Sequence, residues 1–66
     1  MVFSARDLCR EAEREIKQRR RVYGRLIEQK KMRKADADRQ IAMMEQIMAD
    51  YDAKAQAEER RGELPL

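Results

Sequence analysis

Apolar and small residues recur with a helical period in the first half of the chain. They occupy Cys9, Ala12, Ile16, Tyr23 and Leu26, in steps of three and four once position 19 is counted. A helix of 3.6 residues per turn places such positions on one side. Ser4 precedes this stripe as a favourable N-cap, and Asp7 suits the positive end of the helix dipole. We expect a helix over about residues 4–29, with Arg19 as the one charge on its apolar stripe.

The second half repeats the pattern more regularly. Its stripe, in steps of four and three, is Ala37, Ile41, Met44, Met48, Tyr51 and Ala55. This predicts a helix over about 35–60, reached through a turn at about 30–34, with no good N-cap before it. Gly62 and Pro65 end any helix, so residues 62–66 are expected to be a flexible tail and residues 1–61 a single helical hairpin.

Gly24 lies inside the first stripe. A glycine in a helix interior costs about 1 kcal/mol relative to alanine. Because Leu26 and Ile27 continue the stripe, the helix is expected to run through this position. The pattern leaves open whether Gly24 kinks or breaks it.

Two amphipathic helices joined by a short turn pack antiparallel, which predicts an all-α, coiled-coil-like hairpin. With a turn near 31–33, the numbers of facing residues add up to about 64. Ile16 then faces Met48, and Arg19 faces Glu45. We predict a partly buried Arg19–Glu45 ion pair that fixes the alignment of the two helices rather than adding much stability.

A chain of 66 residues buries a small core, and small scaffolds need a further support. With one cysteine and no histidine, an intramolecular disulfide is excluded and a zinc site is not expected. The support that remains for so small a core is oligomerisation or folding on a partner. Apolar residues beside the two main stripes would stay partly exposed in a lone hairpin: Leu8, Val22, Ile27, Met43 and Ile47. We expect them to support self-association, most economically as a dimer forming a four-helix bundle.

Charge is distributed unevenly although the net charge is only +3. Residues 14–34 hold ten basic and two acidic residues, whereas residues 35–66 hold four basic and eight acidic ones. The basic residues expected on the outer face of the first helix and at the turn are Arg14, Lys17, Arg20, Arg21, Arg25, Lys30, Lys31, Arg33 and Lys34. Such a surface suits phosphates, an acidic protein, or solvent alone. Among these readings we favour a protein partner over nucleic acid.

Other functions find little support in the sequence. There is no histidine, no nucleophile beside a base and no glycine-rich phosphate loop, so we expect no catalysis, small-molecule substrate or cofactor. The acidic residues have no calcium-loop spacing and are expected on helices, so no metal site is predicted. No apolar segment approaches the length of a membrane span, and the first residues do not resemble a signal peptide. These features favour a cytoplasmic protein.

Several short motifs carry a resemblance to a known group. They are Glu15-Ile16, a basic run ending in Val22-Tyr23, Lys31-Met32, and Ala37-Asp38 followed by Ile41-Ala42, Met44-Glu45 and Ile47. Together they resemble short proteins encoded in prophages and phages of Gram-negative bacteria. The resemblance implies a bacterial host cell and no known biochemical activity. In that group glycine is common at the position of Lys30, serine or threonine at that of Arg33, and proline at that of Gly24.

The sequence therefore predicts a small, non-enzymatic protein-interaction module, an adaptor or modulator of a host or phage complex. Its contact surface would be the basic helix face and the turn. The alternative is a nucleic-acid-binding accessory protein that uses the same residues.

Overall fold

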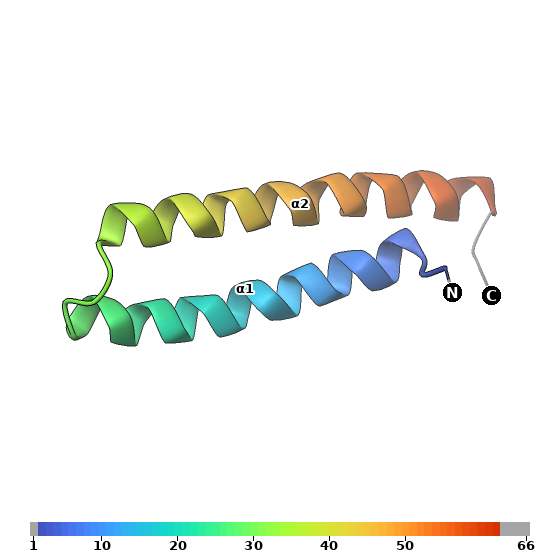
Figure 1. Cartoon of the computed structure of the whole chain (residues 1–66). Coiled ribbons are helices and arrows are strands. Elements are labelled where there is room, and N and C mark those ends of the chain that lie inside the picture. The colour runs from blue at the N-terminus through green and yellow to red at the C-terminus, as the bar shows by residue number, and fades with distance from the viewer. Residues whose placement is uncertain (1, 63–66) are drawn as a thin grey trace.

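The computed structural model describes residues 2–62 as two long helices that lie antiparallel side by side (Figure 1). Helix α1 spans Ala5–Glu28 and helix α2 spans Lys34–Arg61. The all-α helical hairpin predicted from the two stripes is confirmed. The sequence placed the helices at about 4–29 and 35–60, so each observed limit differs by one residue. Most of the predicted tail, residues 63–66, lies outside the described residues.

Helix α1 begins at the expected cap and runs without interruption through Gly24. The Ser4 hydroxyl accepts a hydrogen bond from the backbone N–H of Asp7 at 3.0 Å, which satisfies one of the free donors of the first turn. Gly24 lies within the helix, and beyond the neighbouring backbone of α1 a Cβ added there would meet no atom within 4 Å. Glycine therefore does not break α1, because the hydrogen-bond ladder needs no side chain at this exposed position.

The end of α1 is a Schellman motif formed without glycine. The Lys31 N–H donates to the Leu26 carbonyl at 2.8 Å, and the Lys30 N–H donates to the Ile27 carbonyl at 3.0 Å. This geometry requires a left-handed residue, and Lys30 adopts it with a φ of 58°. Helix α2 then starts at Lys34, after the N-cap residue Arg33, whose side chain makes no capping hydrogen bond. Both ends of the connection therefore hold residues that are not the best suited to their positions.

A narrow seam of small side chains joins the helices. The buried apolar residues among those described are Ala5, Cys9, Ala12, Ile16, Ala37 and Ala55. Most of them lie in the half of the hairpin away from the turn, and no large side chain within residues 2–62 is fully buried. The larger stripe residues, such as Tyr23, Met44 and Met48, are half-buried. This core removes little apolar surface from water, as expected for a chain of this length.

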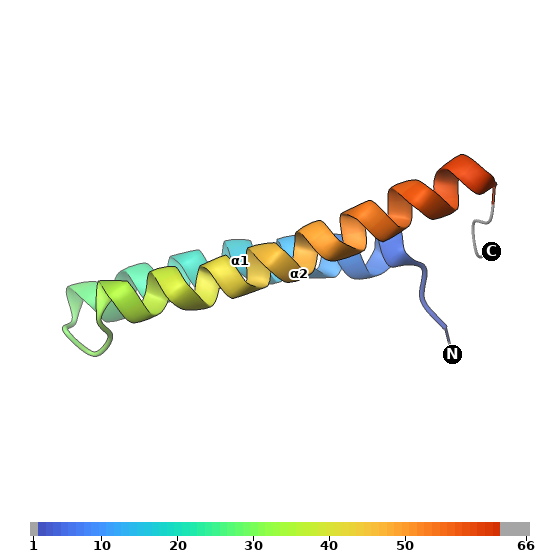
Figure 2. The same ribbon diagram turned by 90° about the horizontal axis from the view of Figure 1, so that it is seen from above.

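The connecting loop and the segment before α1 both project toward the same side of the hairpin, as Figure 2 shows from above. Each projection borders a surface hollow. Phe3 before α1 lines one hollow together with Leu8 of the helix. Loop residues 30–33 line the other together with Gln40 and Met43 of α2. The two projections therefore stand at opposite ends of one open side.

Candidate interaction surfaces

Ion pairs between the helices lie along one open side of the hairpin. Arg6 donates to Asp52 at 2.7 Å and to Glu59 at 2.9 Å, and Arg20 donates to Glu45 at 3.3 Å. Positions 6 and 20 are fourteen residues apart in α1, and positions 45, 52 and 59 are spaced by seven in α2, so each set follows one flank of its helix. We call this the ion-pair side.

Arg6 is the most strongly engaged of these cations. It approaches Glu59 with two nitrogens, because Nε also donates to Oε2 at 3.3 Å. These hydrogen bonds raise the pKa of Arg6 above its ordinary value and lower the pKa of Glu59 below its own. Two-nitrogen pairing of this kind fixes geometry better than a single contact does. It clamps the start of α1 to the last turns of α2.

The predicted Arg19–Glu45 ion pair is wrong. Arg19 Nε donates to Glu15 on its own helix at 2.8 Å, and the carboxylate of Glu45 pairs with Arg20 instead. Pairing residues whose numbers add up to about 64 predicts which residues lie at the same height along the hairpin. It does not predict on which side of its helix each residue lies. Residue 20 lies on the ion-pair side with Glu45, whereas Arg19 lies on the other flank, where Glu15 is four residues away and within reach.

The opposite flanks of both helices form a second open side, which carries four large, partly exposed apolar side chains. Leu8 and Val22 are fourteen residues apart and lie on the flank of α1 away from Arg6 and Arg20. Met43 and Ile47 follow the flank of α2 away from Glu45. Their exposures are 36% for Leu8, 39% for Val22, 50% for Met43 and 44% for Ile47. We call this the apolar side. Ile27, expected with this group, is half-buried and lines the hollow at the turn.

The apolar side contains few ionic contacts. Arg19 and Glu15 form a pair within α1, and the Glu15 hydrogen bond raises the pKa of Arg19. Tyr23 donates its hydroxyl to Gln40 at 2.8 Å, which bridges the two helices near the turn. The two sides of the hairpin therefore differ in kind: one is held together by charges, and the other leaves large apolar side chains in contact with water.

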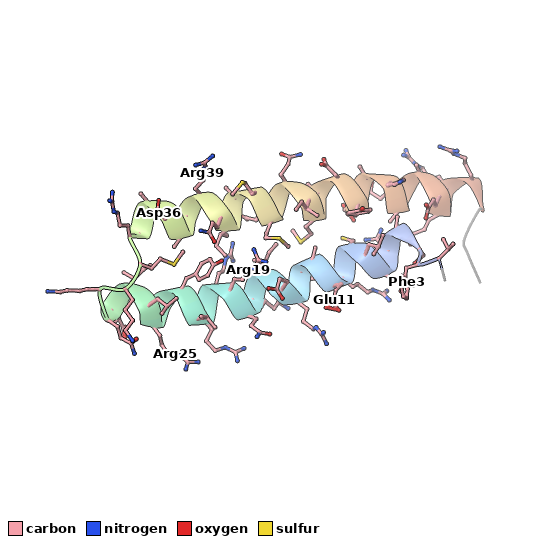
Figure 3. The ribbon with its side chains drawn as sticks, in the orientation of Figure 1. Phe3, Glu11, Arg19, Arg25, Asp36 and Arg39 are labelled. Carbon is pink, nitrogen blue, oxygen red and sulfur yellow. The ribbon has the colours of Figure 1, made fainter. Side chains whose placement is uncertain are left out.

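The nine predicted basic residues divide into two groups. Four of them already pair with a carboxylate of the same chain: Arg14 with Glu11, Lys17 with Glu13, Arg20 with Glu45 and Lys34 with Asp38. The other five are exposed and form no ion pair among the described residues: Arg21, Arg25, Lys30, Lys31 and Arg33. All five lie on the last two turns of α1 or in the loop. Figure 3 shows Arg25 directed away from α2.

Arg39 joins these five residues, although the sequence did not single it out. It lies on α2 and lines a hollow of about 840 Å³ together with Lys30, Lys31 and Arg33. Ile27, Met32 and Met43 supply apolar lining to the same hollow, and Asp36 is its one acidic residue. Arg39 belongs to residues 35–66, which are mainly acidic, so the sequence did not group it with the basic residues at the turn. We call Arg21, Arg25, Lys30, Lys31, Arg33 and Arg39 the turn-end cluster.

Cys9 and several acidic residues take structural positions. Cys9 is buried in the seam, with Sγ 3.6 Å from the Met48 carbonyl oxygen. Asp38, Asp52 and Glu59 each pair with a cation of the chain. Neither described helix contains an apolar stretch that could cross a membrane. Comparison of the chain with protein-family models, with curated proteins and with solved structures found no match.

Proposed function

We propose that this protein is a small non-enzymatic interaction module that binds an acidic surface of another protein and self-associates. The turn-end cluster supports the first part. Its six cations have no carboxylate partner among the described residues, whereas every other predicted site cation is already neutralised by a neighbour. Unpaired cations gathered around one end of the hairpin give that end a positive potential that attracts an acidic partner.

The length of the turn-end cluster favours protein over nucleic acid. The sequence suggested a basic strip along the whole outer face of α1, which could have followed a phosphate backbone. In the structure, Glu11 and Glu13 pair with Arg14 and Lys17 and interrupt that strip. Tyr23, the aromatic residue nearest the cluster, is half-buried and bonded to Gln40, so it does not present a free ring for base stacking.

A phage or prophage setting and a bacterial cytoplasmic location belong to the same proposal. They rest on the motif resemblance between residues 15 and 47. The self-association part rests on the apolar side, where Leu8, Val22, Met43 and Ile47 remain substantially exposed. A sedimentation mass equal to one chain at tens of micromolar, about the range for weak association, would contradict self-association.

Two charge-reversal variants of the same helix test the contact surface. Arg21→Glu/Arg25→Glu changes two residues of the turn-end cluster, and Arg14→Glu/Lys17→Glu makes the same change in net charge among paired residues. In affinity capture from bacterial host lysate, we expect a partner retained by the native chain to be lost with the first variant and kept with the second. Equal loss with both would indicate charge attraction without a defined surface.

The nucleic-acid alternative is tested by fluorescence anisotropy with short DNA and RNA, titrated from about 50 to 200 mM salt. We expect no binding at low salt. Micromolar or tighter binding that falls steeply as salt rises would make the turn-end cluster a phosphate-binding surface instead.

A further inference from the structure

The two hollows at the ends of the apolar side carry opposite charge. The hollow at the turn combines the apolar residues Ile27 and Met32 with Lys30 and Lys31 on its rim. The hollow at the other end, of about 360 Å³, combines Phe3 and Leu8 with the acidic residues Asp7 and Glu11. Each hollow therefore has the chemistry that the other would bind: apolar lining with a charged rim of the opposite sign.

From this complementarity we infer that a second copy of this chain docks on the apolar side with its turn beside the termini of the first. The pair is antiparallel and related by a twofold axis. This inference rests on the self-association in the proposed function and adds its arrangement. An alignment with both turns at one end would bring the lysines of two equivalent hollows together, and like charges that meet across an interface are destabilising. The antiparallel alignment brings Lys30 and Lys31 to the partner's Asp7.

The middle of the apolar side is suited to the same symmetry. The Arg20–Glu45 and Tyr23–Gln40 contacts place residues 46–48 of α2 level with Lys17 of α1. A twofold axis at this level sets α1 against α1 of the partner subunit and α2 against α2 of the partner subunit. Glu15 and Arg19, which lie on either side of position 17, then face the oppositely charged residue of the other copy. Ile47 meets its own equivalent across the axis.

The arrangement covers the half-exposed apolar residues and spares the outer face of α1. Leu8 at one end and Val22 toward the other contact the partner's α1, while Met43 and Ile47 contact its α2. Lys30 and Lys31 of the turn-end cluster lie within the contact. Arg21 and Arg25 remain outside it and available to an acidic partner, so the partner-binding variants described above leave the dimer intact. An isologous contact of this kind needs only one self-complementary patch per chain, which suits a protein with a small core.

Cysteine cross-linking tests the arrangement directly. In a Cys9→Ala background, which removes the chain's one cysteine, Ile47→Cys places two thiols beside the twofold axis. We expect mild oxidation to give a covalent two-chain product in high yield. Met43→Cys is the matched control, because its side chain is as exposed but its two copies would be separated by about eight residues, or roughly 12 Å along antiparallel helices. That separation exceeds the reach of a disulfide.

The outcomes separate this inference from the proposed function. A two-chain sedimentation mass with equal cross-linking at positions 43 and 47, or with none at either, would overturn the antiparallel arrangement while leaving self-association in place. A one-chain mass would overturn both.

A second measurement uses charge: Lys31→Glu is expected to weaken the dimer severalfold, and adding Asp7→Lys to it is expected to restore affinity. No recovery in the double variant would contradict the pairing of the two hollows.

Discussion

Lys30 occupies a backbone position that glycine would fill at lower cost. Its φ of 58° is left-handed, and an L side chain there costs about 1 kcal/mol or more relative to glycine. We predict that Lys30→Gly raises the free energy of unfolding by about 1 kcal/mol, measured by urea titration with circular dichroism at fixed protein concentration. Lys31→Gly is the control, because Lys31 is not in the left-handed region. A loss of stability in Lys30→Gly would show that the lysine side chain itself stabilises the turn.

Gly24 presents the opposite case. It lies in the helix interior with open space around its Cβ position, so alanine would gain helix propensity without a clash. We predict that Gly24→Ala stabilises the hairpin by about 1 kcal/mol, with higher helicity by circular dichroism. An unchanged or lower melting temperature would mean that the backbone at Gly24 is not helical in solution.

Local sequence was sufficient to predict both helices and the nature of their N-caps, because these depend on neighbours within a few positions. Ser4 forms the expected cap, and Arg33 indeed provides none. The partner of Glu45 was not predictable in the same way. Arg19 and Arg20 lie at nearly the same level, and the rotation of α1 about its own axis decides which of them reaches α2. That rotation follows from packing of the small seam residues, which numbers alone do not reveal.

The clamp of Arg6 on Asp52 and Glu59 makes the pairing of the helices sensitive to acid. Because folding lowers the pKa of Glu59 below its ordinary value of 4.5, the contribution of Glu59 to stability is complete above that pH. It is lost as the pH falls through the lower folded-state pKa. We predict that the melting temperature decreases below about pH 4.5, and that it decreases less in Glu59→Gln than in the native chain. Equal decreases would assign the acid sensitivity to other carboxylates.

The start of α2 offers a further gain in stability at the level of the element. Arg33 occupies the N-cap with an extended backbone but makes no side-chain hydrogen bond to the first turn. We predict that Arg33→Ser stabilises α2 by about 1 kcal/mol. Because Arg33 also belongs to the turn-end cluster, the same change should weaken binding of an acidic partner. Stabilisation together with undiminished partner binding would remove Arg33 from the contact surface.

For the whole molecule, the exposed apolar side predicts stability that depends on concentration. If two chains associate through it, the melting temperature rises with protein concentration. We expect Ile47→Glu to abolish this dependence, because it places a charge beside the twofold axis. Ala53→Glu adds the same charge at an exposed position of α2 and should preserve the dependence. A melting temperature that is independent of concentration in the native chain would contradict self-association.

The place of Arg39 beside the basic residues of the turn depends on the folded molecule. It lies eight residues beyond Lys31 in an acidic half of the chain, yet it lines the same hollow because α2 runs back along α1 from the turn. Likewise, the sequence grouped Leu8, Val22, Met43 and Ile47 as side residues. Whether they share one side of the hairpin follows from the handedness of two antiparallel helices, which requires their three-dimensional arrangement.

The beginning of α1 and the end of α2 lie together at one end of a body about 48 Å long, and the turn lies at the other (Figure 1). A chain attached to a sensor surface through either end would therefore hold its turn-end cluster away from that surface. A second chain captured in antiparallel fashion would carry its own cluster back toward the support. Fluorophores at the ends of the two chains would then be separated by roughly the full length of the body, so energy transfer between them would be lower than in a complex with both turns at one end.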